Sequence, residues 1–150
     1  MSANPYQGPA ATLADPGEKT QTVTLFAASS RIGRARYIAY SLALGVLLGF
    51  GAAFLASFVG AAGLIFWIGA WALLVVLVFL LTIQRCHDFN ASGWLSLLLL
   101  LPPLALNFVL LPGTRTSNRY GAPPPPTSRL VLAVAGALPL VVLFFFWRSL

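Results

Sequence analysis

The side chains best suited to chemistry in this chain lie in one short segment, QRCHDFNASGW, residues 84–94. Cys86 and His87 are the chain's only cysteine and only histidine, and Asp88 is its only acidic residue after position 18. Arg85 precedes them, and long apolar runs flank the segment on both sides. The segment is therefore either a reaction centre or a polar connection between two helices.

This arrangement of residues does not suit catalysis or metal binding. Consecutive residues on a helix point about 100° apart, so Cys86, His87 and Asp88 do not converge on one metal ion. Cys86 as a nucleophile with His87 as its base lacks a third group to orient the base. A proton relay through His87 and Asp88 stays open, because ionisable groups at membrane depth are often functional. We favour a structural connection and expect no catalytic residue, no metal and no cofactor.

Asp88 has the clearest structural role in such a connection. From position 31 onward the chain has eight arginines but only one carboxylate side chain, that of Asp88. Pairing offsets the cost of placing a charge at a partly dehydrated interface. We expect Asp88 to pair with Arg85, or across the bundle with Arg34 or Arg36. The other residues of the segment can have structural roles. Asn90 or Ser92 can cap the next helix, Gly93 permits a close approach, and Trp94 can anchor at the level of the lipid headgroups.

The composition indicates that a bilayer, not water, surrounds most of the chain. Hydrophobic residues make up 59% of it, charged residues 8%, and the mean hydropathy is +0.87. A soluble domain carries about 25% charged residues. The apolar residues form continuous runs with no polar face for water. Residues 1–30 differ: we expect a disordered, polar N-terminal tail without the order of features that a signal peptide needs.

The apolar runs predict the helices. Residues 37–84 contain no charge, and as one helix they would reach ~72 Å, more than twice the ~30 Å hydrocarbon core. We therefore expect helices over 36–60 and 64–85 with a turn at Gly60–Gly63. A third run, 94–111, is long enough to cross but is interrupted by Pro102 and Pro103, which predicts a kinked span or, alternatively, a re-entrant hairpin.

A proline-rich linker, 122–129, leads to a fourth run, 130–147, which contains Pro139. We expect an all-α integral membrane protein, a bundle of about four transmembrane helices whose third and fourth members are kinked by proline. Residues 31–121 form the membrane domain with about three of these helices, and 130–147 adds the last.

The arginines predict the orientation. Arg31, Arg34 and Arg36 crowd the start of the first helix, which places the N-terminus in the cytoplasm. Together they add ~3 kcal/mol of preference for anionic lipid headgroups. Four complete spans are preferred because the third run is long enough, but they put three later arginines outside, against the positive-inside rule. A re-entrant third segment keeps these inside and sends the C-terminus out: Arg115, Arg119 and Arg129.

Small residues recur every four positions along the first helix. They include Gly45, Gly49, Ala53 and Ser57. Small side chains on one ridge let two helix backbones approach closely in lipid. The ridge predicts packing against another helix of the same chain or against a second copy, which would make a homo-oligomer.

Three motifs in order, RIGRARYIAY, RCHDFNASGW and PGTRTSNRYG, resemble a bacterial inner-membrane family called domain of unknown function 805. The resemblance covers about 31–121 and implies a bacterial membrane protein with no assigned reaction. The chain departs from the family pattern at Gln84, where arginine is usual, at Cys86 and at Ile38, and by a C-terminal helix added after the prolines. Carried over position by position, the family motif falls on Arg31, Arg34, Arg85, His87, Asp88, Ser92, Gly93, Trp94, Pro112, Gly113, Thr114, Asn118, Arg119, Tyr120 and Gly121.

Three function classes are considered, and the third, an intramembrane enzyme, lacks the paired catalytic groups facing one cavity that it requires. We expect a polytopic protein of the bacterial cytoplasmic (inner) membrane that is not an enzyme and acts through association with lipids, with itself or with a protein partner. The alternative is a small transporter or proton-coupled channel using His87 and Asp88 with Arg85 and Asn107. No nucleic acid partner is expected, because the pI of about 10.5 arises from arginines at helix ends and not from a basic stripe on a soluble face.

Overall fold

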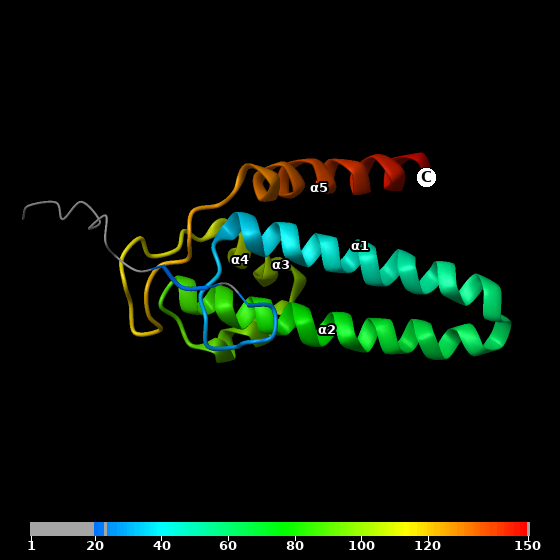
Figure 1. Cartoon of the computed structure of the whole chain (residues 1–150), viewed down its shortest axis with the longest axis horizontal. Helices are drawn as coiled ribbons and strands as arrows, with labels where there is room; N and C mark the ends of the chain where they lie inside the picture. The colour runs from blue at the N-terminus through cyan, green and yellow to red at the C-terminus, as the bar shows by residue number, and fades with distance from the viewer. Residues whose placement is uncertain (1–19, 23, 150) are drawn as a thin grey trace, which may run out of the picture.

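A long helical hairpin forms the body of the protein in the computed structural model, which describes residues 20–22 and 24–149. The first helix, α1 (Arg34–Val59), and the second, α2 (Gly63–Asp88), run antiparallel (Figure 1) and are joined by a short 3-10 turn, η1 (Gly60–Ala62). Gly60 has φ 56°, a left-handed conformation that glycine adopts readily. The turn predicted at Gly60–Gly63 is confirmed.

Contacts between α1 and α2 extend along the hairpin. Near the turn, a Cβ on Gly63 would lie 2.7 Å from the Cα of Ala56, so glycine permits the close approach there. At the open end, where α1 begins and α2 ends, the hydroxyls of Tyr37 and Thr82 are hydrogen-bonded at 3.1 Å. α1 begins two residues before its predicted start and ends one residue before its predicted end, whereas α2 exceeds its predicted bounds at both ends and continues to Asp88. The reactive segment therefore starts inside a helix.

The helical segment Arg34–Asp88, folded back at η1, is long and apolar enough to cross a membrane. Its most apolar window has a mean hydropathy of 2.9, and only 11% of that window is buried inside the protein. Each 26-residue helix is ~39 Å long, against the ~30 Å of a hydrocarbon core. Large apolar side chains are exposed on the half of α1 that leads to the turn. Phe50 and Phe58, for example, are 70% and 72% exposed.

The third expected helix, 94–111, is not one kinked helix. It consists of three short pieces: the 3-10 helix η2 (Gly93–Leu100), α3 (Pro102–Ala105) and α4 (Asn107–Leu110). Leu101 is extended, with φ −111° and ψ 97°, because a residue before proline is pushed out of the helical region. Pro102 and Pro103 then occupy the first turn of α3, where a missing backbone N–H costs little.

This segment begins and ends at the same end of the hairpin. It leaves α2 after Asp88, and the N–H of Thr114 donates back to the carbonyl of Asp88 at 2.8 Å. In Figure 1, η2 runs beside α2 and the chain returns through α3 and α4. The backbone therefore turns back, as the re-entrant alternative requires, and the described part of the chain contains three long helices where four continuous ones were predicted.

The last long helix, α5 (Arg129–Ser149), starts at the open end of the hairpin and packs on α1. It runs in the same direction as α1 (Figure 1). It contains Pro139, and its bounds extend the predicted 130–147 by a residue or two at each end.

The core lies at the open end. A buried apolar cluster there combines residues from four parts of the chain: Ile32, Tyr37, Leu81, Cys86 and Phe108. The loop before α1 closes over it, since the N–H of Ile32 donates to the carbonyl of Gln84 at 3.3 Å and the N–H of Gln21 to that of Pro123 at 3.2 Å. Of the tail expected over 1–30, residues 20–22 and 24–30 form this loop, and 1–19 lie outside the described residues.

Candidate functional site

Asp88 is the centre of a buried ion cluster, which we define as Arg31, Arg85 and Asp88. One carboxylate oxygen, Oδ1, accepts from Nη2 of Arg31 at 3.2 Å, and Oδ2 accepts from Nη1 of Arg85. Both arginine side chains are 0% exposed. The predicted pairing of Asp88 with Arg85 is confirmed, and the partner across the bundle is Arg31 in place of Arg34 or Arg36.

Arg31 ties the loop before α1 to the chain after α4. Its Nη1 donates to the carbonyls of Thr116 at 3.0 Å and Gly121 at 2.9 Å. Its Nη2 donates to the carbonyl and the hydroxyl of Thr114, at 2.6 Å and 2.8 Å, as well as to Asp88. A planar guanidinium group with five N–H donors suits such a concave set of acceptors. Arg31 therefore holds together residues more than eighty positions apart.

Arg85 closes the other side of the ion cluster. Its Nε donates to the carbonyl of Phe108 at 2.8 Å and its Nη2 to the carbonyl of Leu111. These carbonyls lie at the C-terminal end of α4, where a helix leaves acceptors without internal partners. Its guanidinium group also lies 5.6 Å from the ring centre of Phe89. Arg85 thereby holds the return of the re-entrant segment against α2.

The segment after α4 fits tightly around Asp88. The Thr114 hydroxyl donates to the Asp88 carbonyl at 2.9 Å, and the Asn118 amide donates to the His87 carbonyl at 2.9 Å and to the Thr114 hydroxyl at 3.0 Å. Gly113 touches the Asp88 carboxylate so closely that a Cβ there would overlap it. The glycine of the P-G-T motif is thus explained by the space that the carboxylate needs.

The ion cluster carries one excess positive charge, since two guanidinium groups face one carboxylate. Asp88 is the only acidic residue in the described part of the chain, because Asp15 and Glu18 lie outside it. Carbonyl dipoles surround the excess charge in place of a second carboxylate. The cluster therefore makes its surroundings favourable for an anion.

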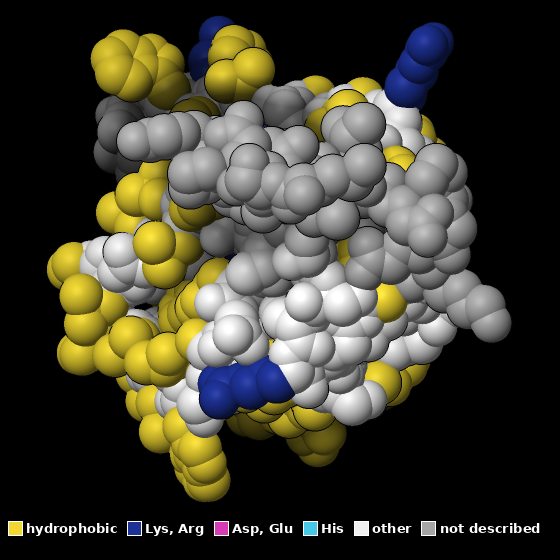
Figure 2. All heavy atoms as spheres, turned by 90° about the vertical axis from the view of Figure 1, so that its left-hand side faces the viewer, with side chains coloured by type: hydrophobic (Ala, Val, Ile, Leu, Met, Phe, Trp, Pro, Cys, Tyr) yellow, Lys and Arg dark blue, Asp and Glu magenta, His cyan; other side chains and the backbone are white. Residues whose placement is uncertain are grey.

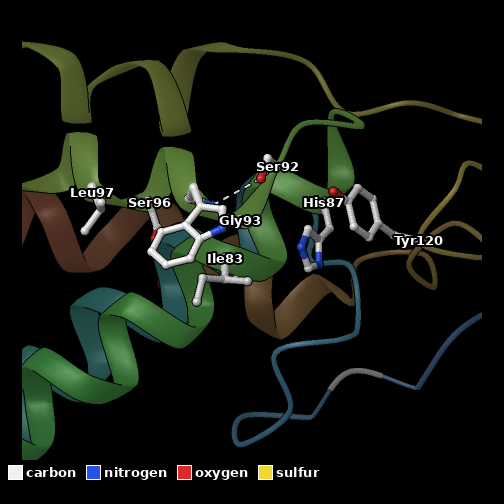
Figure 3. A pocket seen from close by; sticks show the side chains of 8 residues that line it. Ile83, His87, Ser92, Gly93, Ser96, Leu97 and Tyr120 are labelled. Carbon is white, nitrogen blue, oxygen red and sulfur yellow. Dashed lines mark hydrogen bonds between the residues drawn. The ribbon is translucent and has the colours of Figure 1, made fainter.

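His87 points to the other side of α2, into a cavity of about 440 Å³. We call this the His87 cavity (Figure 3); it is lined by Ile83, His87, Ser92, Gly93, Trp94, Ser96, Leu97 and Tyr120. The imidazole stacks on the Tyr120 ring, with ring centres 3.7 Å apart and planes at 11°. The guanidinium group of Arg119 lies 4.8 Å from the centre of the same tyrosine ring.

The two imidazole nitrogens have different surroundings. Nδ1 is buried and makes no hydrogen bond of regular geometry. The backbone of Ala28 and Ser30 lies near the ring. Nε2 faces Gly93, since a Cβ on that glycine would lie 3.3 Å from it. His87 is 8% exposed, so a largely buried ring forms part of the cavity lining.

The neighbouring motif residues have structural tasks. Ser92 is the N-cap of η2, where its hydroxyl accepts from the N–H of Trp94 at 3.5 Å. Asn90, the other predicted cap, instead takes a left-handed turn with φ 61°. Gln84 faces away from the ion cluster and donates to the carbonyls of Thr24 and Ala27 at 2.8 Å and 2.7 Å. The change from arginine at this position therefore leaves the ion cluster intact.

Sequence reasoning missed Gln21, whose side chain fastens the N-terminal loop to the third motif. Its amide donates to the Tyr120 carbonyl at 2.9 Å and its carbonyl oxygen accepts from the N–H of Arg31 at 3.2 Å. Gly121, with φ 111°, leaves the space that this amide fills. No pattern in the polar stretch before α1 distinguishes Gln21 from its neighbours.

The arginines at the start of α1, which were predicted to favour anionic lipid headgroups, are only partly exposed. Arg31 is 0% and Arg36 8% exposed, and Arg36 donates to the carbonyls of Pro125 and Pro126. Figure 2 looks onto the open end, where Lys or Arg side chains protrude at separate places among the described residues. Four arginines of this end are classed as exposed: Arg34, Arg115, Arg119 and Arg129.

The small-residue ridge of α1 does not serve as a close contact at its two glycines. A Cβ on Gly45 or Gly49 would meet no atom within 4 Å, and Ala53 and Ser57 are exposed. The close approach of α1 to α2 occurs at Ala56 instead. Of the two predicted partners for this ridge, a second copy of the chain stays a prediction.

The candidate chemistry of the reactive segment is divided between separate surroundings. Cys86 is 0% exposed within the apolar core, Asp88 is held by two arginines, and the Asn107 amide bonds to its own turn through the Leu104 carbonyl at 3.0 Å. In the described part of the chain, no three His, Cys, Asp or Glu side chains come together in a metal-binding group. His87, by contrast, lies in the lining of the His87 cavity.

These features define an all-α protein with a long apolar helical hairpin, a following segment that turns back to the open end of the hairpin, and a buried ion cluster at that end. The chain belongs to the family described as Protein of unknown function (DUF805), which matches residues 25–122, about two thirds of the chain. The predicted resemblance is confirmed, and α5 lies beyond the matched residues. No curated protein and no solved structure gives a significant match.

Proposed function

We propose that the chain is a polytopic protein of the bacterial inner membrane that is not an enzyme and acts through association with lipids or proteins. In this proposal α1, α2 and α5 span the bilayer, and η2, α3 and α4 re-enter it from the cytoplasmic side. The N-terminus lies in the cytoplasm and the C-terminus outside.

The observation that carries the proposal is the distribution of the arginines. Seven of the eight lie at the open end of the hairpin, and only Arg148 lies towards the end of α5. The positive-inside rule places such an end in the cytoplasm. With a re-entrant third segment the rule is satisfied by Arg115, Arg119 and Arg129, which four complete spans would put outside.

Exposed apolar side chains support the same placement. Ile65 and Phe54 are 74% and 65% exposed on the hairpin, and Leu140 is 67% exposed on α5. Soluble monomers rarely expose contiguous apolar patches beyond a few hundred Å².

Reporter fusions test this topology. Green fluorescent protein and alkaline phosphatase, fused in separate experiments after Ala61, Gly121 and Leu150, report the cytoplasmic and the outer side. We expect Ala61 and Leu150 outside and Gly121 inside. Four spans would place Gly121 outside and Leu150 inside, and a soluble protein would place all three inside. Either result would overturn the proposal, while Ala61 serves as the control common to both membrane topologies.

Lipid association follows from the exposed arginines. Each adds about 1 kcal/mol near an anionic leaflet, so the four exposed arginines supply up to ~4 kcal/mol. We expect the purified protein in mixed nanodiscs to enrich phosphatidylglycerol over phosphatidylcholine. Replacing Arg34, Arg115, Arg119 and Arg129 with glutamine should abolish the enrichment. Equal lipid recovery by the unchanged protein would remove this part of the proposal.

A further inference from the structure

The His87 cavity has the features of a binding site for one phosphate-bearing amphiphile. We propose that it binds the phosphate group of a single anionic phospholipid from the cytoplasmic leaflet. This inference rests on the membrane placement proposed above and adds a defined site to it. It is supported by the imidazole in the cavity lining, the charge around the cavity and the shape of its lining.

The imidazole of His87 forms part of the cavity lining. It is fixed on one face by the stacked Tyr120 ring, and only 8% of the residue is exposed. Its Nε2 lies beside Gly93, another lining residue, and its Nδ1 is buried without a hydrogen-bond partner. Both nitrogens are donors when the ring is an imidazolium. A phosphate oxygen in the cavity would accept from the Nε2–H of that form, and the Ser92 hydroxyl also lines the cavity (Figure 3).

The charge around the cavity favours an anion. Arg119 lies 4.8 Å from the Tyr120 ring that stacks on His87. The ion cluster beneath carries an excess positive charge, and its Asp88 carboxylate is neutralised by two arginines. No other acidic side chain occurs in the described part of the chain. An anionic headgroup therefore meets attraction and no opposing carboxylate there.

The lining of the cavity suits an amphiphile better than a free anion. Of its lining, His87 and Ser92 lie where α2 ends, whereas Trp94 and Leu97 lie on η2 and are 82% and 51% exposed. Leu100, further along η2, is 67% exposed. A lipid bound here places its phosphate beside His87 and the start of its acyl chains along η2. Trp94 is also a residue type that settles at the headgroup level.

Because His87 is the only histidine, isotope-labelled histidine gives a single-residue NMR probe of the cavity once any affinity tag is removed. The full chain in zwitterionic detergent is titrated with dioctanoyl phosphatidylglycerol, dioctanoyl phosphatidylcholine, glycerol phosphate or inorganic phosphate. We expect the imidazole signal to shift with phosphatidylglycerol and to saturate at one lipid per chain. Glycerol phosphate and inorganic phosphate should shift it at least tenfold less at equal concentration.

Two variants test the contacts separately, with bound lipid counted by native mass spectrometry. His87→Phe keeps a stacking ring but removes the donor and should weaken binding about 10- to 100-fold, the value of a hydrogen bond to a charged group. Trp94→Gln changes an exposed side chain that the fold does not need and should weaken lipid binding severalfold. Phe26→Gln changes a 77% exposed aromatic side chain outside the cavity lining; it is the matched control for Trp94→Gln and should keep the bound lipid.

Each alternative result overturns the inference. An unmoved imidazole signal, or unchanged lipid binding in both His87→Phe and Trp94→Gln, would exclude the cavity as the site. Equal affinity for glycerol phosphate would assign it to a soluble phosphate compound, and equal affinity for phosphatidylcholine would remove the anionic preference. Binding in detergent does not depend on topology, so these failures are distinct from a failed reporter fusion.

Discussion

Replacing Asp88 with asparagine removes one negative charge from the ion cluster while keeping the shape of the side chain. In the protein, the carboxylate accepts from Arg31 on one oxygen and from Arg85 on the other, and both arginines are 0% exposed. The asparagine amide would direct its own N–H groups at one of these donors. The two guanidinium groups would then face each other in a buried site without a counter-charge.

The expected cost follows from that burial. Removing one partner of a buried ion pair costs about 3–5 kcal/mol, because the remaining charge is left uncompensated. Exposed pairs give ~0–1 kcal/mol, but solvent screens neither arginine here. We therefore expect Asp88→Asn to lower the free energy of local unfolding at this end of the hairpin by about 3–5 kcal/mol. This raises the population of the locally unfolded form roughly 100- to 4,000-fold.

Cys86 supplies the assay, since it is the only cysteine and is 0% exposed in the core next to the ion cluster. A maleimide dye reacts with it only when this region opens, so the labelling rate in detergent reports the open population when reclosing is fast. Asp88→Asn should label faster by the factor above. Arg34→Gln, an exposed arginine near the same loop, should stay within about threefold. Wild-type labelling of Asp88→Asn would refute the role of the carboxylate.

Three further substitutions have defined outcomes in the same labelling assay. Gly113→Ala overlaps the carboxylate of the ion cluster and should cost about 1–3 kcal/mol, whereas Gly45→Ala, with no atom within 4 Å, should label no faster than wild type. Thr114→Val removes a hydroxyl that donates to one group and accepts from two and should cost about 1–3 kcal/mol. Tyr120→Leu should lose about 0.5–1.5 kcal/mol of ring stacking on His87 and Tyr120→Phe almost none; equal labelling of the two variants would contradict that role.

The hairpin could be predicted from the sequence because its causes are local. Residues 37–84 form an uncharged run about twice as long as one membrane span, and Gly60–Gly63 interrupt it. A helical hairpin is the arrangement that fits both features. The pairing of Asp88 with Arg85 is also local, since the two lie three positions apart on one helix. Such features depend on spacing, which a sequence displays directly.

The re-entrant segment could be named only as an alternative, because hydropathy carries no direction. Residues 94–111 are apolar whether they cross or return. What decides the path is the hydrogen bond between Asp88 and Thr114 and the extended Leu101 before two prolines. The choice of Arg31 over Arg34 likewise depends on how the loop before α1 is fastened by Gln21, a contact that no spacing rule contains.

The residues that form the ion cluster and their acceptors leave the ribosome at different times during translation. Arg85 and Asp88 leave the ribosome almost together and can pair within the nascent α2 helix, whereas Arg31 waits for acceptors as far along the chain as Gly121. Domains assemble as their segments emerge. The nascent chain therefore holds Arg31 without its full set of acceptors for some ninety residues of synthesis, and α5 emerges only after the last of these acceptors.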